Sequence, residues 1–360
     1  MDITINELGQ LTPDSYILLD MRGDVEVGHG IIPGAIHMSK EEILEKYSGG
    51  LVKADEAEAA EREDSAEKKL IIYCARGRIS QELAEELRDR GYDAYSLKGG
   101  YTSWLLNEMK NQQADEVCAQ VEKSIRKKFR KNIWCKFTKA INQYELVKEG
   151  DCIAVCISGG KDSMLMAKLF QELKLHNKFP FEVKFVVMDP GYSPENRKVI
   201  EENARKLKIP IHIFESDIFE SVYHIEKSPC YLCARMRRGY LYNFAKELGC
   251  NKIALGHHYD DVIETILMGM LYGAQIQTMM PKLHSTNFEG MELIRPLYLI
   301  REDDIKAWRD YNDLRFIQCA CKFTDTCTTC NNEENQSKRV EIKQLIAEIK
   351  KKNPYVEAHI

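Results

Sequence analysis

Residues 151–174 of the 360-residue chain read DCIAVCISGGKDSMLMAKLFQELK. The apolar run 152–157 predicts a buried strand, the two glycines 159–160 predict a tight loop, and residues 161–174 predict a helix. Glycines let the backbone approach an anion closely, and the N-terminus of the following helix offers free N–H groups and a positive dipole end. The stretch therefore predicts a phosphate site inside an α/β domain.

Strands and helices alternate around this stretch. Further strand patterns are FEVKFVVMDPG (181–191), PIHIFES (210–216) and NKIALGHH (251–258), and further helix patterns are ENRKVIEENARKLK (195–208) and DDVIETILMGMLYG (260–273). Strands separated by helices of this length predict a parallel sheet with helices on both faces. Ligands bind outside the carboxyl ends of such strands, so we expect Asp189, Gly256 and His257 to face the same crevice as the glycine loop.

A second, smaller α/β domain is predicted at the N-terminus. SYILLDMR (15–22), KKLIIYC (68–74) and AYSLKGG (94–100) predict strands, and ISQELAEELRDRGY (79–92) predicts an amphipathic helix. The charged stretch 53–69 has few apolar residues and is interpreted as a solvated insertion. We therefore expect a domain over 1–106, a linker over 107–120, a larger domain over 121–350 and a tail over 351–360.

The composition excludes several protein classes. The chain is 44% hydrophobic and 30% charged, with a net charge of -5. No apolar run approaches the roughly 18 residues that a membrane span needs. The first residues, MDITINE, are acidic and lack the apolar region of a secretory signal. A membrane protein, a collagen and a coiled coil are excluded, and we expect a cytoplasmic protein that does not associate with membranes.

The net charge averages two unlike regions. Residues 1–120 hold 13 Lys and Arg against 24 Asp and Glu, a net of -11, and the remainder holds 38 against 32, a net of +6. Within 121–141 there are eight basic residues and one acidic residue, Glu122. Ile125, Phe129, Ile133, Phe137 and Ile141 recur every four residues there and predict a buried helix face. The basic residues are interpreted either as a solvated helix face or as a surface for the phosphates of RNA.

The chain holds 12 cysteines, which in a cytosolic protein indicate metal binding or catalysis more often than disulfides. Cys230 and Cys233 form a CxxC motif, and Cys319, Cys321, Cys327 and Cys330 follow in a second group. Thiolates at this spacing favour zinc or an iron–sulfur centre. A lone CxxC is also compatible with a redox pair, but the second group favours a shared metal site. Five other thiols are expected to be buried and structural: Cys118, Cys135, Cys152, Cys156 and Cys250.

The motif SGGKDS after a strand differs from the Walker pattern and resembles the PP-loop ATP pyrophosphatases, which cleave ATP to AMP and pyrophosphate. The resemblance implies ATP as the nucleotide and catalytic roles for Lys161 and Asp162. The nucleotide-binding residues are then expected to be Ser158, Gly159, Gly160, Lys161, Asp162, Ser163, Asp189, Gly256, His257 and Asp261. Asp261 and Glu264 have the oxygen ligands that suit Mg²⁺, although acidic residues at a helix start also act as caps.

Seven motifs in order resemble the tRNA 2-thiocytidine synthetase family over roughly residues 121–350. They are SGGKDS, PCYLCARMRRG, GHHYDDVIET, MLYG, PKL, IRPL and a final RE-x-DI. The resemblance implies a 4Fe–4S cluster held by Cys230, Cys233 and a third cysteine, Cys321 as first choice and Cys319 as second. The extra Cys327 and Cys330 are interpreted either as a separate zinc site with Cys319 or as inert.

The same resemblance implies a reaction. ATP adenylates the carbonyl oxygen at C2 of a tRNA base, and sulfur then displaces AMP. The loop amides and Lys161 are expected to stabilise the phosphate charge. The implied base is cytidine 32 of the anticodon loop, and a homodimer is compatible with the resemblance.

The N-terminal 106 residues resemble the rhodanese domain. The matching motifs are DMR (20–22), GHGIIPGA (28–35), YCARGRIS (73–80) and LKGGY (97–101) with Trp104. Cys74 follows a strand and precedes a helix, so backbone N–H groups there are expected to lower the pKa of its thiol. Such a thiolate holds a persulfide. The usual rhodanese loop has Arg at the position of Ile79, which leaves the sulfur donor open between a cysteine desulfurase and a small persulfide or thiosulfate.

The predicted function is an ATP-dependent tRNA sulfurtransferase, with tRNA and a sulfur donor as partners. Three alternatives remain at this point: synthesis of 2-thiouridine in tRNA, an ATP-dependent amide ligase without a cluster, and a non-catalytic sulfur carrier or redox sensor.

Overall fold

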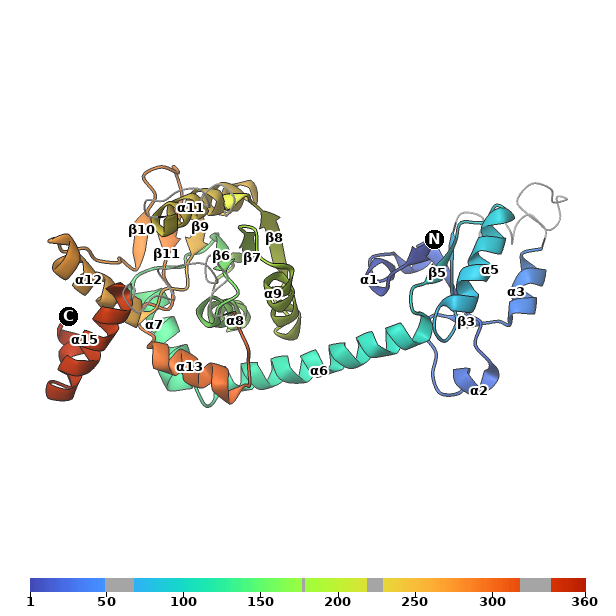
Figure 1. Ribbon diagram of the computed structural model, residues 1–360, viewed down its shortest axis with the longest axis horizontal. Coiled ribbons are helices and arrows are strands. Elements are labelled where there is room, and N and C mark those ends of the chain that lie inside the picture. The colour runs from blue at the N-terminus through green and yellow to red at the C-terminus, as the bar shows by residue number, and fades with distance from the viewer. Residues whose placement is uncertain (49–67, 177–178, 219–228, 318–337) are drawn as a thin grey trace. The chain divides into compact units, whose positions relative to one another are not determined.

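Two mainly parallel sheets organise the chain, one in each of two units, Met1–Gln113 and Ala114–Ile360 (Figure 1). The structure is a computed structural model that describes residues 1–48, 68–176, 179–218, 229–317 and 338–360. The predicted insertion 53–69 lies almost wholly outside these residues. In the described residues, every helix is too short or too polar to cross a membrane.

The first unit contains a five-stranded parallel sheet in the order β1-β5-β4-β2-β3. Its strands are β1 (Asp2–Ile3), β2 (Tyr16–Asp20), β3 (Ile36–His37), β4 (Lys69–Tyr73) and β5 (Ala94–Leu97). Its helical segments are α1 (Ile5–Leu8), η1 (Pro13–Ser15), α2 (Asp24–Val27), α3 (Lys40–Lys46) and α5 (Arg78–Asp89). Alternate residues of β4 face opposite sides of the sheet. Ile72 therefore packs against α3 and α5, and Ile71 packs with Leu8 of α1 on the other face. The three predicted strands and the helix are confirmed; β1 and β3 are too short to show a pattern.

The second unit contains a six-stranded sheet in the order β10-β11-β9-β6-β7-β8. Its strands are β6 (Cys152–Ile157), β7 (Glu182–Asp189), β8 (Ile211–Glu215), β9 (Lys252–Ala254), β10 (Lys282–His284) and β11 (Glu292–Ile294). All neighbours are parallel except β10, which pairs antiparallel with β11 at the edge. The parallel sheet is thus confirmed, and this edge hairpin is an addition that sequence patterns of three residues did not predict.

Helices cover both faces of the second sheet, as expected. The main helices are α8 (Lys161–His176), α9 (Pro194–Lys206), α11 (Pro229–Glu247), α12 (Tyr259–Gly273) and α13 (Glu302–Tyr311). Val155 lies in the large apolar cluster with α8, α9 and α13, whereas its neighbour Ala154 packs with residues of α11. Side chains of a strand alternate between faces, so a fully apolar strand such as β6 serves two cores at once.

The segment predicted as one helix over 121–141 contains a break. Helix α6 (Gly100–Arg126) is followed by a π-helix, η2 (Arg130–Trp134), and by α7 (Cys135–Gln143). The five apolar residues of the predicted face are nevertheless all buried. A repeat of four residues drifts off one face of an α-helix with about 3.6 residues per turn. The wider π turn compensates for this drift, which is why one face stays buried throughout.

The C-terminal residues pack on the second unit. Helix α15 (Lys338–Lys352) lies against α12 (Figure 1). Ile342 and Ile346 of α15 form a buried cluster with Ile263 of α12. Residues 351–360, treated above as a tail, contain the short helix α16 (Val356–His359). This packing brings basic residues of α15 to the edge of the sheet where the glycine loop lies.

Candidate active site

The glycine loop connects the carboxyl end of β6 to the first turn of α8. Gly159 has a φ of +82°, and a Cβ there would lie 2.7 Å from the side chain of Ile200. Only glycine fits such a positive φ and such a close approach without strain. The loop therefore leaves its backbone N–H groups at the start of a 16-residue helix, an arrangement suited to a phosphate.

The two serines of the motif stabilise the loop itself. The buried hydroxyl of Ser163 accepts a hydrogen bond from the backbone of Ser158 (3.1 Å) and donates one to the carbonyl of Gly160 (3.0 Å). The end of β9 lies against the same turn, since a Cβ on Gly256 would lie 3.2 Å from the backbone nitrogen of Ser163. Gly256 is thus close to the loop, as expected from the strand order.

Lys161 lies between two carboxylates. Its ammonium is 3.1 Å from Asp162 and 3.2 Å from Glu302 at the start of α13. A cavity of ≈ 720 Å³ adjoins Gly160, Lys161 and Asp162. Three further cations line that cavity: Lys306, Arg309 and Arg315. The cavity thus combines loop amides with several positive charges, which suits a polyphosphate.

Asp189 and His257 lie at the same edge, as predicted, but differ in their surroundings. The buried carboxylate of Asp189 accepts hydrogen bonds from the backbone of Gly191 (2.9 Å) and Tyr192 (2.7 Å) and pairs with Arg197 (3.2 Å). Asp189 therefore shapes the turn after β7. Burial, followed by the charge of Arg295, lowers the pKa of His257 to about 4, so His257 is neutral at neutral pH.

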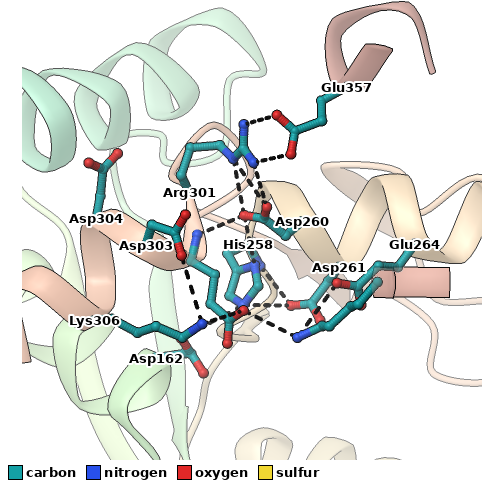
Figure 2. A network of polar contacts seen from close by, with 12 residues as sticks. Asp162, His258, Asp260, Asp261, Glu264, Arg301, Asp303, Asp304, Lys306 and Glu357 are labelled. Carbon is teal, nitrogen blue, oxygen red and sulfur yellow. Dashed lines mark hydrogen bonds and ion pairs between the residues drawn. The ribbon is translucent and has the colours of Figure 1, made fainter. Parts of the chain in front are cut away.

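The expected magnesium ligands, Asp261 and Glu264, are labelled in Figure 2, and each pairs with a cation of α15. Asp261 lies 2.8 Å from Arg339, and it accepts a 3.0 Å hydrogen bond from the backbone of His258 at the start of α12. Glu264 is 2% exposed and lies 3.6 Å from Lys343, and its burial raises its pKa to about 7. In the described ranges no three His, Cys, Asp or Glu side chains are arranged to hold a metal. As arranged here, Asp261 and Glu264 do not fit a Mg²⁺ site.

Arg301 joins the site to the C-terminus (Figure 2). Its guanidinium binds Glu357 of α16 at 2.6 and 2.9 Å and Asp260 of α12 at 2.8 Å. Asp260 in turn accepts the backbone N–H of Glu302 at 2.7 Å. These contacts hold the starts of α12 and α13 together with α16.

The predicted cluster ligands are only partly described. Cys230 and Cys233 lie in the first two turns of α11, one helical turn apart, and their side chains are outside the description. Cys319, Cys321, Cys327 and Cys330 all lie outside the described residues. The spacing of Cys230 and Cys233 places them on one side of the helix, and three thiolates are the donors that iron–sulfur clusters use. The donor set therefore fits a cluster.

Cys74 has the environment expected of a reactive thiol. Its sulfur accepts hydrogen bonds from the backbone of Gly77 (3.1 Å) and from the hydroxyl of Ser80 (3.5 Å). Burial alone would raise the pKa of this thiol, but the hydrogen bonds from Ser80, Arg76 and Gly77 outweigh burial and lower it. Arg76 and Arg78 are exposed beside it. The loop thus favours a thiolate at its centre.

The thiols expected to be buried and structural follow that expectation in part. Cys118, Cys156 and Cys250 are buried, and Cys152 is half-buried, 3.3 Å from Cys250. Cys135 is exposed, because it follows the π turn on the solvent side of α7. The expectation was therefore wrong for Cys135.

The basic residues of 121–141 mostly face solvent. Exposed members are Lys123, Arg126, Lys127, Lys128, Arg130, Lys131 and Lys139. Arg126 pairs with Glu172 at 2.7 Å, and the half-buried Lys136 pairs with Asp304 at 3.1 Å. The others form an exposed positive surface beside the π turn.

Sequence reasoning missed Glu302, Lys343 and Arg339. Glu302 belongs to the quoted RE-x-DI motif, but its contact with Lys161 depends on packing of α13 against α8. Lys343 and Arg339 lie on α15, whose basic composition resembles any solvated helix. No pattern in the sequence indicates that these two side chains lie against α12.

Two family models match the chain. A PP-loop domain matches residues 129–327, and a rhodanese-like domain matches residues 4–107. The chain belongs to the PP-loop family. Both resemblances predicted from the sequence are thereby confirmed, and so is the α/β fold of each region.

Two sequence relatives share a more specific name than the family models give. A tRNA-cytidine(32) 2-sulfurtransferase of Chromohalobacter salexigens is 35% identical over 235 residues, which cover 63% of this chain and 78% of the relative. A protein of the same name from Burkholderia cenocepacia is 36% identical over 222 residues, covering 60% of this chain and 63% of the relative. The chain thus spans less than two thirds of that second relative.

A solved structure also aligns with the chain. It is the U34-tRNA thiolase NcsA from Methanococcus maripaludis with its [4Fe-4S] cluster, 21% identical with a TM-score of 0.49. The alignment covers 62% of this chain and 74% of that one.

Proposed function

We propose that this PP-loop protein is an ATP-dependent tRNA sulfurtransferase that thiolates C2 of cytidine 32 in the anticodon loop. The observation that carries the proposal is the glycine loop, which presents helix N–H groups and Lys161 to a cavity of ≈ 720 Å³. The sequence relatives named tRNA-cytidine(32) 2-sulfurtransferase support the choice of base.

The first proposed step activates the base. The carbonyl oxygen at C2 attacks the α-phosphorus of ATP, an O–P bond forms, and pyrophosphate leaves with the electron pair of the broken bond. The loop amides and Lys161 stabilise the negative charge that develops on the phosphate oxygens. No step depends on Mg²⁺ at Asp261 and Glu264, because both carboxylates are paired with α15.

The second proposed step replaces oxygen with sulfur. Hydrosulfide attacks C2 and loses its proton, a C–S bond forms, and the C–O bond breaks as AMP leaves with the original carbonyl oxygen. When the sulfur comes from the Cys74 persulfide, a thiol reductant cleaves the S–S bond, which releases hydrosulfide and oxidises two reductant thiols to a disulfide. Cys230, Cys233 and Cys321 would hold a 4Fe–4S cluster, which when bound offers an iron with an open position for sulfide. The sequence-based preference for Cys321 over Cys319 remains a prediction.

The first unit is proposed to accept the sulfur. The Cys74 thiolate attacks the outer sulfur of a donor persulfide, a new S–S bond forms, and the donor leaves as its thiolate. The hydrogen bonds from Gly77 and Ser80 stabilise the thiolate of Cys74, which is the reactive form, and lower the pKa of the thiol. Competition between a protein persulfide and thiosulfate for Cys74 identifies the donor.

The deciding experiment is mass spectrometry of tRNA nucleosides from a strain that lacks this chain. We expect 2-thiocytidine to disappear and 2-thiouridine to remain. The wild type should restore it, and Lys161→Met should not. Lys174→Ala, an exposed change on the same helix, is the matched control and should restore it fully.

The alternatives give different results. If the strain that lacks this chain loses 2-thiouridine and keeps 2-thiocytidine, the substrate base is uridine and not cytidine. Absence of iron and acid-labile sulfide in anaerobically purified protein would favour an amide ligase. Failure to form AMP from ATP in the presence of tRNA would favour a sulfur carrier.

A further inference from the structure

Arg295 occupies a buried position at the edge of the sheet where the glycine loop lies. It directly follows β11, which runs parallel to β9, so its backbone lies at the carboxyl end of the strands. Its backbone N–H donates to the carbonyl of Pro281 at 2.9 Å, and its guanidinium donates to the carbonyl of Met280. The residue is 7% exposed.

The guanidinium of Arg295 lacks an acidic partner in the described part of the chain. Its buried Nε has no hydrogen-bond acceptor there. Other arginines at this edge are paired: Arg301 with Asp260 and Glu357, and Arg197 with Asp189. A buried cation without a counter-ion is costly, and burial accordingly lowers the pKa of Arg295 to about 10.

The groups that face Arg295 increase this cost. Arg238 of α11 repels it and lowers its pKa further, after burial. His257, at the end of β9, is neutral with its buried Nδ1 unpartnered. The phenols of Tyr242 and Tyr298 complete the surroundings and carry no charge at neutral pH. The described residues thus place no carboxylate beside the guanidinium of Arg295, and the exposed Arg238 adds a second positive charge.

An anion between the two guanidiniums would relieve both the repulsion and the missing hydrogen bond. A planar guanidinium matches a phosphate with two parallel N–H···O bonds, whereas a carboxylate from the chain itself would neutralise the region permanently. We propose that Arg295, with Arg238, binds a phosphate group of the substrate complex. This inference rests on the proposed function, which supplies two sources of that group: the nucleotide and the RNA backbone.

The test compares wild type with Arg295→Gln and Arg295→Lys in the full chain. Three probes are titrated separately: a non-hydrolysable ATP analogue, an RNA hairpin with the anticodon-loop sequence, and inorganic pyrophosphate. We expect Arg295→Gln to bind one of the first two about tenfold more weakly, and Arg295→Lys to fall between. If the source is RNA, the slope of log affinity against log salt should fall by about 0.7, the value for one phosphate of a single strand. Arg205→Gln, an exposed change of equal charge, is the control and should match wild type.

The outcomes separate the possibilities. A loss confined to the ATP analogue assigns the nucleotide phosphate, and a loss confined to the hairpin assigns the RNA backbone. Unchanged affinity for all three probes overturns the inference, while 2-thiocytidine formation still tests the proposed function separately. Equal losses for every probe, with a lower unfolding temperature, also overturn it, because a structural role predicts that result. If wild type binds neither ATP nor hairpin, the proposed function fails, and pyrophosphate alone decides the role of Arg295.

Discussion

The ammonium of Lys161 lies 3.2 Å from the carboxylate of Glu302, so the cation of the glycine loop already has a partner before any phosphate arrives. Glu302 also contacts Lys306 at 3.1 Å and Lys343 at 3.2 Å. Burial raises the pKa of Glu302, but these lysines outweigh burial and lower it to about 2. Glu302 is therefore ionised at neutral pH and competes with a phosphate for Lys161.

Replacement of Glu302 with Gln should tighten nucleotide binding. The change removes one carboxylate that competes with a phosphate for Lys161, which then keeps only its contact with Asp162 (3.1 Å). We expect the affinity for a non-hydrolysable ATP analogue to rise about threefold to tenfold, which corresponds to about 0.7–1.4 kcal/mol. Calorimetric titration of the full chain measures this directly.

The control for Glu302→Gln is Asp303→Asn on the same helix. Asp303 is 86% exposed and forms a long ion pair of 3.8 Å with Lys306, so its replacement should leave the affinity unchanged. Weaker binding by Glu302→Gln would contradict the competition and indicate that Glu302 instead positions Lys161 for the phosphate.

Ser80→Ala should shift the reactivity of Cys74 to higher pH. The pKa of Cys74 is lowered because hydrogen bonds to the thiolate, Ser80 first, outweigh the effect of burial. Removing the Ser80 hydroxyl raises the pKa of the Cys74 thiol in the folded protein, so the thiolate forms at higher pH than in wild type. The measurement is the alkylation rate of the Cys74 peptide against pH, followed by mass spectrometry.

The matched control for this profile is Ser96→Ala. The hydroxyl of Ser96 lies 2.9 Å from that of Ser80 but does not contact Cys74, so this variant should keep the wild-type profile. A profile that shifts equally in both variants would mean that packing of the two serines, and not the bond to sulfur, sets the pKa.

Sequence patterns predicted those parts of the fold that local periodicity encodes. The fully apolar strand β6 could be recognised because both of its faces are buried, with Ala154 and Val155 in different clusters. The π turn η2 could not be recognised, because its only sign is a four-residue repeat that also describes an ordinary helix. The hairpin of β10 and β11 was missed since its strands have three residues each.

The candidate site was predictable where one segment supplies the chemistry. Residues 158–163 are contiguous, and the sharp turn at Gly159 follows from the sequence alone. Glu302 and Lys343 come from distant segments, and only tertiary packing brings Glu302 to Lys161 and Lys343 to Glu302. The ion pairs of Asp261 and Glu264 were missed for the same reason, because Arg339 and Lys343 approach them from α15.

Glu357→Gln should loosen the C-terminal helix α16. The change removes the negative charge that Arg301 contacts through two hydrogen bonds and Lys350 through an ion pair of 2.7 Å, and the Glu357 side chain is 12% exposed. Arg301 keeps Asp260, so the expected loss in local stability is about 1–2 kcal/mol. Hydrogen exchange of the α16 amides should then be about 5–30-fold faster than in wild type. Glu348→Gln, an exposed change on α15, should leave exchange unaltered; equal acceleration by both would attribute the effect to net charge.

Cys74→Ala should uncouple sulfur delivery from base activation. In the proposed reaction Cys74 accepts sulfur, whereas adenylation uses the glycine loop of the other unit. We therefore expect the variant to form AMP from ATP with tRNA at the wild-type rate, but to lose 2-thiocytidine formation when a persulfide donor is the sulfur source. Free sulfide at high concentration should restore the product, because sulfide does not require a persulfide carrier.

The control for this variant is Cys135→Ala, which removes an exposed thiol from the second unit and should leave every rate unchanged. Normal 2-thiocytidine from the persulfide donor in Cys74→Ala would show that sulfur reaches the PP-loop domain by another route. If Cys74→Ala also loses AMP formation, base activation depends on Cys74, and the two steps do not occur at independent sites. Transfer from Cys74 is supported only if the variant loses 2-thiocytidine formation, keeps AMP formation and regains the product with free sulfide.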